Sequence, residues 1–235
     1  MEKIIKHTGA SYAGKAHKYA EGVDVKPWNA YYERPAVISL LPILKNARVL
    51  DVGCGSGWYA EYLLNHGANV TAFDFDSEFV KLTQSRIGKR AQVLQADLAE
   101  PLDFAKDGEF DLIICPLVMH YLKDWQPAFR EFHRILKSHG ILIFSTHHPF
   151  MDWKFFKKEN YFSVELLEDE WEIGKISFYR RPLTAMSEDL DSAGFVIERL
   201  LEPQPTKDFQ SALPKEFERL TKNPQFLFIR ARKKE

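Results

Sequence analysis

Residues 48–57 read Arg-Val-Leu-Asp-Val-Gly-Cys-Gly-Ser-Gly, an apolar run that enters a turn with three glycines. A short β-branched run that ends at glycine is typical of a buried strand. Gly53, Gly55 and Gly57 permit positive φ and let the backbone approach a ligand where a Cβ would collide. This stretch therefore predicts a strand that leads into a ligand-binding turn.

Strand-like runs alternate with helix-like segments on both sides of this turn. The strand-like runs are 49–52, 69–73, 92–96, 110–115 and 141–146, and helices are expected at 58–65, 78–86 and 126–137. Ser77 is the expected N-cap of the second helix, and Gly140 follows the third. The alternation predicts crossover helices around a parallel sheet. A helix over 183–193 and two more strands, 195–201 and 225–232, complete the pattern.

The composition indicates one domain over residues 1–235 that recognises a small partner. Of the 235 residues 45% are apolar, which is ample for one core, and the net charge of -1 gives no sign of a nucleic-acid or anionic membrane partner. Cys54 and Cys115 match no disulfide framework or zinc pattern, and no metal site is expected. With no apolar signal core and no run near the roughly 20 residues that span a bilayer, we expect a soluble cytoplasmic protein. Nothing in the sequence indicates the oligomeric state.

Two regions depart from the alternation. Residues 1–47 are rich in Tyr and small residues, which predicts a helical cover over the sheet. Residues 149–180 form an insertion dense in aromatic residues. This insertion is either a cap over a substrate or an accessory β-hairpin that buries its own rings.

Three acidic residues stand at the ends of the first three predicted strands. Asp51 lies within the end of the first strand, Asp74 closes the second and Asp97 follows the third. Open parallel sheets bind ligands beyond the carboxyl ends of their strands. An acid after the second strand can accept both ribose hydroxyls, so the arrangement predicts a nucleoside cofactor.

Spacing and charge distinguish between the possible nucleosides. A dinucleotide fingerprint requires glycine at its sixth position, where this chain has Trp58, and no Gly-Lys-Ser/Thr follows to make a P-loop. Asp51 would repel a pyrophosphate, but it suits a ligand with an ammonium and a sulfonium. These features favour S-adenosylmethionine (SAM) over NAD.

The segment Asp-Val-Gly-Cys-Gly-Ser-Gly resembles the first motif of class I SAM-dependent methyltransferases. The segments 29–36, 117–125 and 181–184 resemble the small-molecule branch known as type 11 methyltransferases. The resemblance covers most of the chain. It implies a Rossmann-like, doubly wound α/β sheet of seven strands, mostly parallel, with an antiparallel last strand.

The resemblance also implies a set of cofactor-binding residues: Asp51, Gly53, Cys54, Gly55, Gly57, Asp74, Phe75, Asp97, Leu98, Pro116, Tyr19, Tyr31 and Arg34. The glycines would line the methionine and ribose, Asp74 would hold the ribose hydroxyls and Asp97 would meet the adenine amino edge. Phe75 would lie beside the adenine, Leu98 would lie with Asp97 at its amino edge, and Tyr19, Tyr31 and Arg34 would lie near the amino-acid end. Pro116 and residues 137–140 depart from the usual pattern of the family.

Methyl transfer is an in-line displacement in which the enzyme mainly aligns the reactants and excludes water. A general base helps when the acceptor is a hydroxyl or a protonated amine, and histidine is the usual choice. His120, after the fourth strand, and His147, at the end of the fifth, are the predicted bases, with His148 next. The alternative is that His120 packs as a scaffold residue and catalysis relies on proximity.

We therefore expect a SAM-dependent methyltransferase that acts on a small-molecule acceptor, whose identity the sequence leaves open. One rival is an NAD-dependent oxidoreductase, which Trp58 and the missing Tyr-x-x-x-Lys pattern disfavour. The other is a non-catalytic SAM-binding regulatory protein that lacks an acceptor site.

Overall fold

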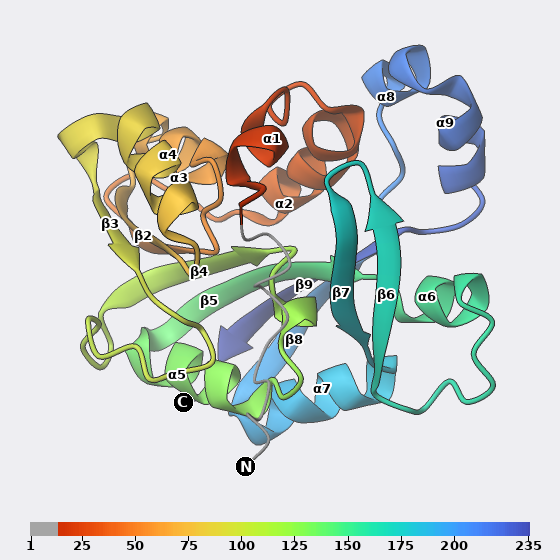
Figure 1. Cartoon of the computed structure of the whole chain (residues 1–235). Helices are drawn as coiled ribbons and strands as arrows, with labels where there is room; N and C mark the ends of the chain where they lie inside the picture. Colours follow the sequence, from red (N-terminus) through yellow and green to blue (C-terminus); the bar gives the residue numbers. More distant parts are fainter. Residues whose placement is uncertain (1–13) are drawn as a thin grey trace.

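A computed structural model describes residues 14–235, whose centre is a seven-stranded sheet in the order β3-β2-β1-β4-β5-β9-β8 (Figure 1). The strands are β1 (Arg48–Val52), β2 (Asn69–Asp74), β3 (Gln92–Gln95), β4 (Phe110–Pro116), β5 (Leu136–His147), β8 (Phe195–Leu201) and β9 (Phe226–Lys233). β3, β2, β1, β4 and β5 pair in parallel, whereas β9 runs antiparallel to β5 and β8. The predicted sheet with an antiparallel last strand is confirmed.

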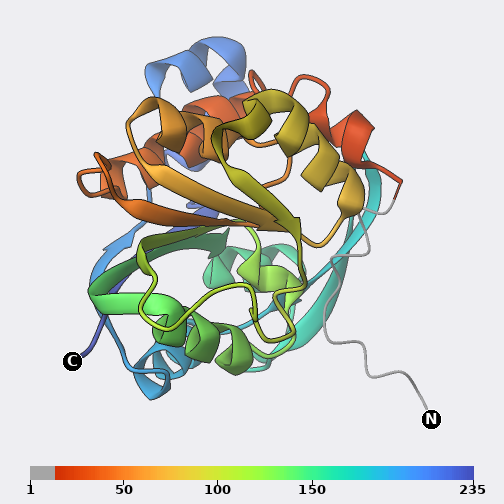
Figure 2. The same ribbon diagram turned by 90° about the vertical axis from the view of Figure 1, so that its left-hand side faces the viewer.

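Helices cover both faces of this sheet (Figures 1 and 2). One face carries α2 (Arg34–Leu40), α3 (Trp58–Asn65) and α4 (Ser77–Ile87), and the other carries α5 (Gln126–Ile135) and α7 (Leu183–Ser192). Successive residues of a strand point to opposite faces. In β4, Ile113 accordingly packs in the core beneath α5 and α7, while Ile114 packs in the core beneath α2 and α3.

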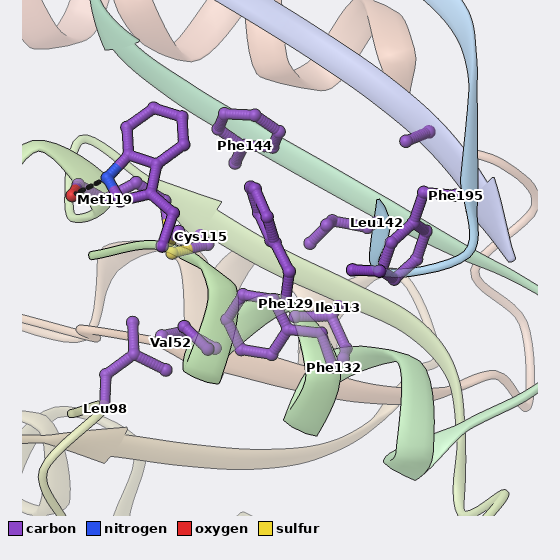
Figure 3. Packing of buried hydrophobic residues seen from close by; sticks show 14 of the residues in the cluster. Val52, Leu98, Ile113, Cys115, Met119, Phe129, Phe132, Leu142, Phe144 and Phe195 are labelled. Carbon is purple, nitrogen blue, oxygen red and sulfur yellow. Dashed lines mark hydrogen bonds between the residues drawn. The ribbon is translucent and has the colours of Figure 1, made fainter. Parts of the chain in front are cut away.

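Aromatic residues fill the core between α5 and the sheet (Figure 3). Phe129 lies 5.5 Å from Phe144 between ring centroids, and Trp125 meets Phe144 edge to face. The Trp125 indole N–H donates to the carbonyl of Met119 at 2.6 Å, which ties the turn after β4 to α5. This turn contains the short 3₁₀ helix η4 (Met119–Tyr121) and carries one of the predicted bases.

Two helix boundaries differ from the prediction. The helix expected to run to 137 ends at Ile135, and β5 begins at Leu136 with an irregular stretch before Ile141. There Gly140 allows a close approach, because a Cβ would lie 2.9 Å from the carbonyl oxygen of Lys137. The N-cap of α4 is Asp76 rather than Ser77, since the Asp76 carboxylate accepts from the amide of Glu78 at 2.8 Å.

The described part of the N-terminal region, residues 14–47, is helical, as predicted, and residues 1–13 lie outside the described part of the chain. It contains α1 (Ala16–Ala20), the π-helical turn η2 (Asn29–Glu33) and α2. Trp28 and Tyr32 pack against Phe209 of the C-terminal pair α8 (Lys207–Ala212) and α9 (Pro214–Leu220). The start and the end of the described chain thus cover the same part of the sheet.

The insertion consists of α6 (Pro149–Phe155) and a separate antiparallel hairpin, β6 (Glu165–Trp171) and β7 (Gly174–Arg180). The accessory hairpin, one of the two alternatives from the sequence, is therefore present. It stands beside the sheet and reaches from the level of α7 to the N-terminal helices (Figure 1). At its tip, the carbonyl of Glu172 accepts from Lys18 at 2.7 Å, and its carboxylate pairs with Lys26 at 2.6 Å.

Within residues 14–235, no helix has both the length and the apolar composition needed to cross a membrane.

Arg181 connects the hairpin to the main core. Its side chain is 3% exposed, and its guanidinium lies 4.0 Å above the ring of Trp125. It donates to the carbonyls of Leu122 and Lys123 and contacts the carboxylate of Asp189 at 3.2 Å. One buried cation thus joins the turn after β4, α7 and the end of β7.

We expect Arg181→Ala to lower the free energy of unfolding by about 3 kcal/mol, since removing one partner of a buried ion pair leaves the other partners unsatisfied. Urea denaturation of the wild type and the variant measures this loss. Arg199→Ala, on the exposed side of β8, is the control and should stay within about 0.5 kcal/mol. Equal losses in the two variants would contradict the role given to Arg181.

Candidate active site

A single cavity of about 1540 Å³ opens beyond the carboxyl ends of β1, β2 and β4 and extends to the hairpin. Small-molecule pockets commonly measure about 300–1,000 Å³. The cavity therefore has room for a nucleoside cofactor and a second molecule beside it. Its walls come from the glycine turn, the N-terminal helices, α6, the hairpin and the α9 region.

The glycine turn forms one wall of the cavity. Gly53, Cys54 and Gly55 line it, and the amides of Gly53 and Cys54 both donate to the carbonyl of Phe73. Gly53 has φ of +67°, and a Cβ there would lie 2.4 Å from the side chain of Val118. Glycine at this position therefore brings the turn close to the segment that follows β4.

Gly57 is placed differently from the prediction. It lies outside the cavity lining, at the N-cap of α3, where a Cβ would lie 3.0 Å from the Cα of Thr83 in α4. The Thr83 hydroxyl donates to the carbonyl of Gly55 at 2.9 Å. Gly57 thus serves the packing of α4 against the turn, which fixes the path of the residues that do line the cavity.

Asp74 presents its carboxyl at the cavity wall where β2 ends. The amide of Gly55 donates to Oδ2 at 2.9 Å, and the amide of Asp76 donates to Oδ1 at 3.0 Å. Burial raises the pKa of Asp74 to about 6. Each oxygen of an ionised carboxylate keeps a further lone pair, so this carboxylate can also accept two hydroxyls of a ribose.

The wall next to Asp74 suits a flat ring. Phe75, Asp97 and Leu98 line it, and the carboxylate of Asp97 is held by the amide of Ala99 at 2.8 Å. Phe75 is 42% exposed. Pro116, where β4 ends, also lines the cavity. The structure thus brings the predicted ribose and adenine residues to one wall.

Asp51 lies behind the turn rather than in the cavity lining. It is 1% exposed, and its Oδ2 has no hydrogen-bond partner among the described residues. Burial and then the charge of Asp74 raise the pKa of Asp51 to about 7. The sequence predicts that Asp51 contacts the charged end of the cofactor. In the structure, the Asp51 side chain does not line the cavity.

The three residues predicted at the amino-acid end are placed in different ways. Tyr19 and Arg34 line the cavity, whereas Tyr31 lies outside the lining, and its carbonyl accepts from the hydroxyl of Thr206 at 2.9 Å. Arg34 donates to the carbonyls of residues 23 and 24 and lies 4.2 Å above the ring of Trp58. Arg34 therefore fastens the N-terminal cover over the glycine turn.

Glu33 lines the cavity, although the sequence analysis did not identify it. It is 2% exposed and ends the π-helical turn η2, a distortion that is frequent at functional sites. Tyr59 donates to one carboxyl oxygen at 2.8 Å, and Ser145 donates to the other at 3.3 Å. Burial raises the pKa of Glu33 to about 7.

The two predicted bases lie against each other. His120 in η4 and His147 at the end of β5 stack with their ring centroids 4.3 Å apart, and both line the cavity. Neither ring nitrogen of His120 has a hydrogen-bond partner among residues 14–235. Burial lowers the pKa of His147 to about 4 and that of His120 well below its usual value, so both imidazoles are neutral near pH 7.

His148, the third histidine considered, lies outside the cavity lining. Its Nε2 contacts the carboxylate of Glu202 at 2.6 Å, and its amide donates to the carbonyl of Gln225. It therefore ties the start of the insertion to the C-terminal region. No group of three metal-ligating side chains with suitable spacing occurs in the described range.

Comparison with known proteins decides which cofactor fits this cavity. Residues 50–144 match the family model described as a methyltransferase domain, Methyltransf_11. These residues form a type 11 SAM-dependent methyltransferase domain. This match sets aside the NAD-dependent oxidoreductase and indicates SAM as the cofactor.

Relatives of this methyltransferase share its sequence or its fold. An uncharacterized protein of Haemophilus influenzae is 28% identical over 88% of this chain and 89% of its own length. The malonyl-[acyl-carrier protein] O-methyltransferase of Enterobacter lignolyticus is 36% identical, but over only 47% of this chain and 43% of its own length. The solved structure of a SAM-dependent methyltransferase from Mesorhizobium loti, 24% identical, superposes with a TM-score of 0.72 over 90% of this chain and 100% of its own. That likeness shows the fold.

Proposed function

We propose that this methyltransferase transfers the methyl group of SAM to a small-molecule acceptor bound next to the cofactor. The cavity supports this proposal, because it continues from the glycine turn and Asp74 to a second chamber at the hairpin. We call this part the acceptor chamber; it is lined by His120, His147, Asp152, Trp171 and Phe178. The single observation that carries the proposal is the buried His120–His147 pair, whose stacked rings line this chamber and whose unpartnered nitrogens are buried among the described residues.

The cofactor site is proposed to consist of Gly53, Cys54, Gly55, Asp74, Phe75, Asp97, Leu98, Pro116 and Tyr19. When bound, SAM supplies a methyl group on a sulfonium that is an excellent leaving group. The chain's own contribution is to hold the nucleoside by its ribose and adenine and to align the reactants in a space that excludes water.

His120 and His147 are proposed to accept the proton that a hydroxyl or protonated amine loses when it attacks the methyl group. A general base must be in its unprotonated form, and burial keeps both imidazoles in this form near pH 7. A scaffold role alone would leave the unpartnered nitrogens of His120 without a purpose, since a buried polar group without a hydrogen bond costs free energy.

The insertion is proposed to cap the acceptor chamber. The chain from the N-terminal cover to β9 is proposed to form one domain. The hairpin places Trp171 and Phe178 on the chamber wall. Its tip is fastened to the N-terminal cover by Lys18 and Lys26, which both contact Glu172. The hairpin and the cover thus meet above the bound molecules.

The proposal is tested by incubating the enzyme with methyl-labelled SAM and a cell extract separated into small molecules, protein and RNA. We expect label to appear in the small-molecule fraction. Label in protein or RNA would contradict the small-molecule acceptor. Tight binding of the demethylated cofactor S-adenosylhomocysteine with no transfer to any fraction would indicate the non-catalytic SAM-binding protein instead.

We expect Trp171→Ala to raise the amount of small-molecule fraction needed for half-maximal labelling by about tenfold, since losing a buried aromatic contact removes roughly 1–2 kcal/mol of binding. Affinity for S-adenosylhomocysteine should stay the same. The control is Phe162→Ala, which removes a ring of the same insertion that is 71% exposed. If the hairpin does not cap the chamber, both variants will give the same labelling curve.

A further inference from the structure

Asp152 is a buried carboxyl in the acceptor chamber that the steps above do not use. It lies in α6, is 5% exposed and lines the cavity. Nδ1 of His147 lies 3.7 Å from its Oδ2, which is too long for a hydrogen bond. Among residues 14–235, no side chain donates a hydrogen bond to it. A buried carboxyl without donors is unfavourable unless a ligand supplies one.

The charges that face Asp152 do not satisfy it. Arg180 lowers its pKa through its charge, but the Arg180 guanidinium donates to the carbonyls of residues 160 and 161 and pairs with Glu165. Asp169, which also lines the cavity, adds negative charge, and its Oδ2 accepts from the indole of Trp171 at 3.0 Å. Lys154, in the same helix, lines the cavity but is exposed to solvent and makes no contact with Asp152.

Aromatic rings and neutral imidazoles complete the surroundings. Phe178 lies 4.4 Å from His147 between ring centroids, and Trp171 lies 6.4 Å from Phe178. Aromatic faces attract cations and also pack against apolar bodies. Because His120 and His147 are neutral, they do not repel a cation in the chamber.

We propose that the acceptor carries a basic amino group next to an apolar or aromatic body, and that Asp152 binds this group as a cation. The inference rests on the proposed function and names the class of its substrate. An ammonium supplies three donors, and the two oxygens of the Asp152 carboxylate can accept from it. The rings of Trp171 and Phe178 provide the surface for the body of the molecule.

An ammonium bound at Asp152 changes the protonation of this carboxyl. Burial raises the pKa of Asp152 to about 8, so its carboxyl is mostly protonated at pH 7 while the chamber is empty. A bound ammonium, with a pKa near 10 in alkylamines, favours the ionised carboxylate and displaces this proton. Amine binding should therefore release close to one proton at pH 7, and affinity should rise as the pH increases from 6 to 8.

The test uses the full chain loaded with S-adenosylhomocysteine and three probes that share a phenylethyl body: 2-phenylethylamine, 2-phenylethanol and 3-phenylpropionate. Calorimetric titration in buffers with different ionisation heats gives both affinity and proton release. We expect the amine to bind at least tenfold more tightly than the alcohol, the carboxylate to bind most weakly, and the heat to report proton release.

Asp152→Asn should reduce the preference for the amine to less than about twofold and abolish the proton release. Glu159→Gln removes one exposed charge from the same insertion and serves as the control. An alcohol that binds as tightly as the amine, or a preference that survives in Asp152→Asn, would overturn the inference. The proton release of the wild type is a second test that does not depend on how the variant folds.

A failure of the amine proposal can be distinguished from a failure of the proposed function. The probes are measured by binding, whereas the proposed function is measured by transfer of label to small molecules. Label transferred to small molecules together with no preference for amines would leave the methyltransferase activity in place and reject only this substrate class.

Discussion

Replacing Asp74 by alanine is expected to weaken the binding of S-adenosylhomocysteine by about 100-fold, or roughly 2.7 kcal/mol. The backbone amides of Gly55 and Asp76 hold this carboxylate in place at the cavity wall. Hydrogen bonds to a charged acceptor contribute about 1.5–3 kcal/mol each, and the substitution removes those to the ribose. The effect on affinity should therefore be large.

Calorimetric titration of the purified variant measures this change, with circular dichroism to confirm the fold. Asp103→Ala removes a carboxylate from an exposed loop away from the cavity and serves as the matched control. Its affinity should equal that of the wild type. A loss of less than threefold in Asp74→Ala would show that Asp74 does not hold the ribose.

Replacing His147 by phenylalanine is expected to lower the rate of methyl transfer by about 100- to 1,000-fold, as general bases contribute about 10²–10⁴. Phenylalanine keeps the stacking against His120 and the shape of the chamber but cannot accept a proton. Affinity for S-adenosylhomocysteine should not change. Because the pKa of His147 is lowered to about 4, the wild-type rate should not fall through protonation of this residue between pH 5 and 8.

The same experiment with His120→Phe identifies which member of the pair takes the proton, since only the base should show the large loss of rate. His66→Gln changes an exposed histidine on the far side of α3 and is the control. If the pair serves only as a scaffold, both phenylalanine variants will keep their rate and change only the free energy of unfolding.

The sheet and the cofactor wall could be predicted because they follow from local patterns and general topology. Alternating strands and helices place all carboxyl ends of the parallel strands at one edge, so Asp74 and Asp97 had to lie together. Gly57 shows the limit of this reasoning. The motif signals a glycine, but the reason for it is Thr83 in α4, and the sequence does not reveal that close approach.

The acceptor side of the cavity was less predictable. The position of Glu33 at the cavity depends on a π-helical turn. The position of Asp152 depends on a seven-residue helix that leaves the sheet directly after β5. No hydrophobic periodicity fixes the direction of such short elements. Tyr31 and Glu33 are two positions apart, and only Glu33 lines the cavity, because residues two apart in a helix do not share a face. Residues 137–140 were misassigned for a related reason, since Gly140 serves a strand irregularity and not a helix end.

The most direct test of the account is a crystal structure of this methyltransferase with S-adenosylhomocysteine bound. We predict that the ribose hydroxyls contact Asp74, that the adenine lies between Phe75 and Leu98, and that the sulfur points toward the chamber lined by His120 and His147. A sulfur that points away from the histidine pair, or an adenosine that occupies the acceptor chamber, would contradict the account.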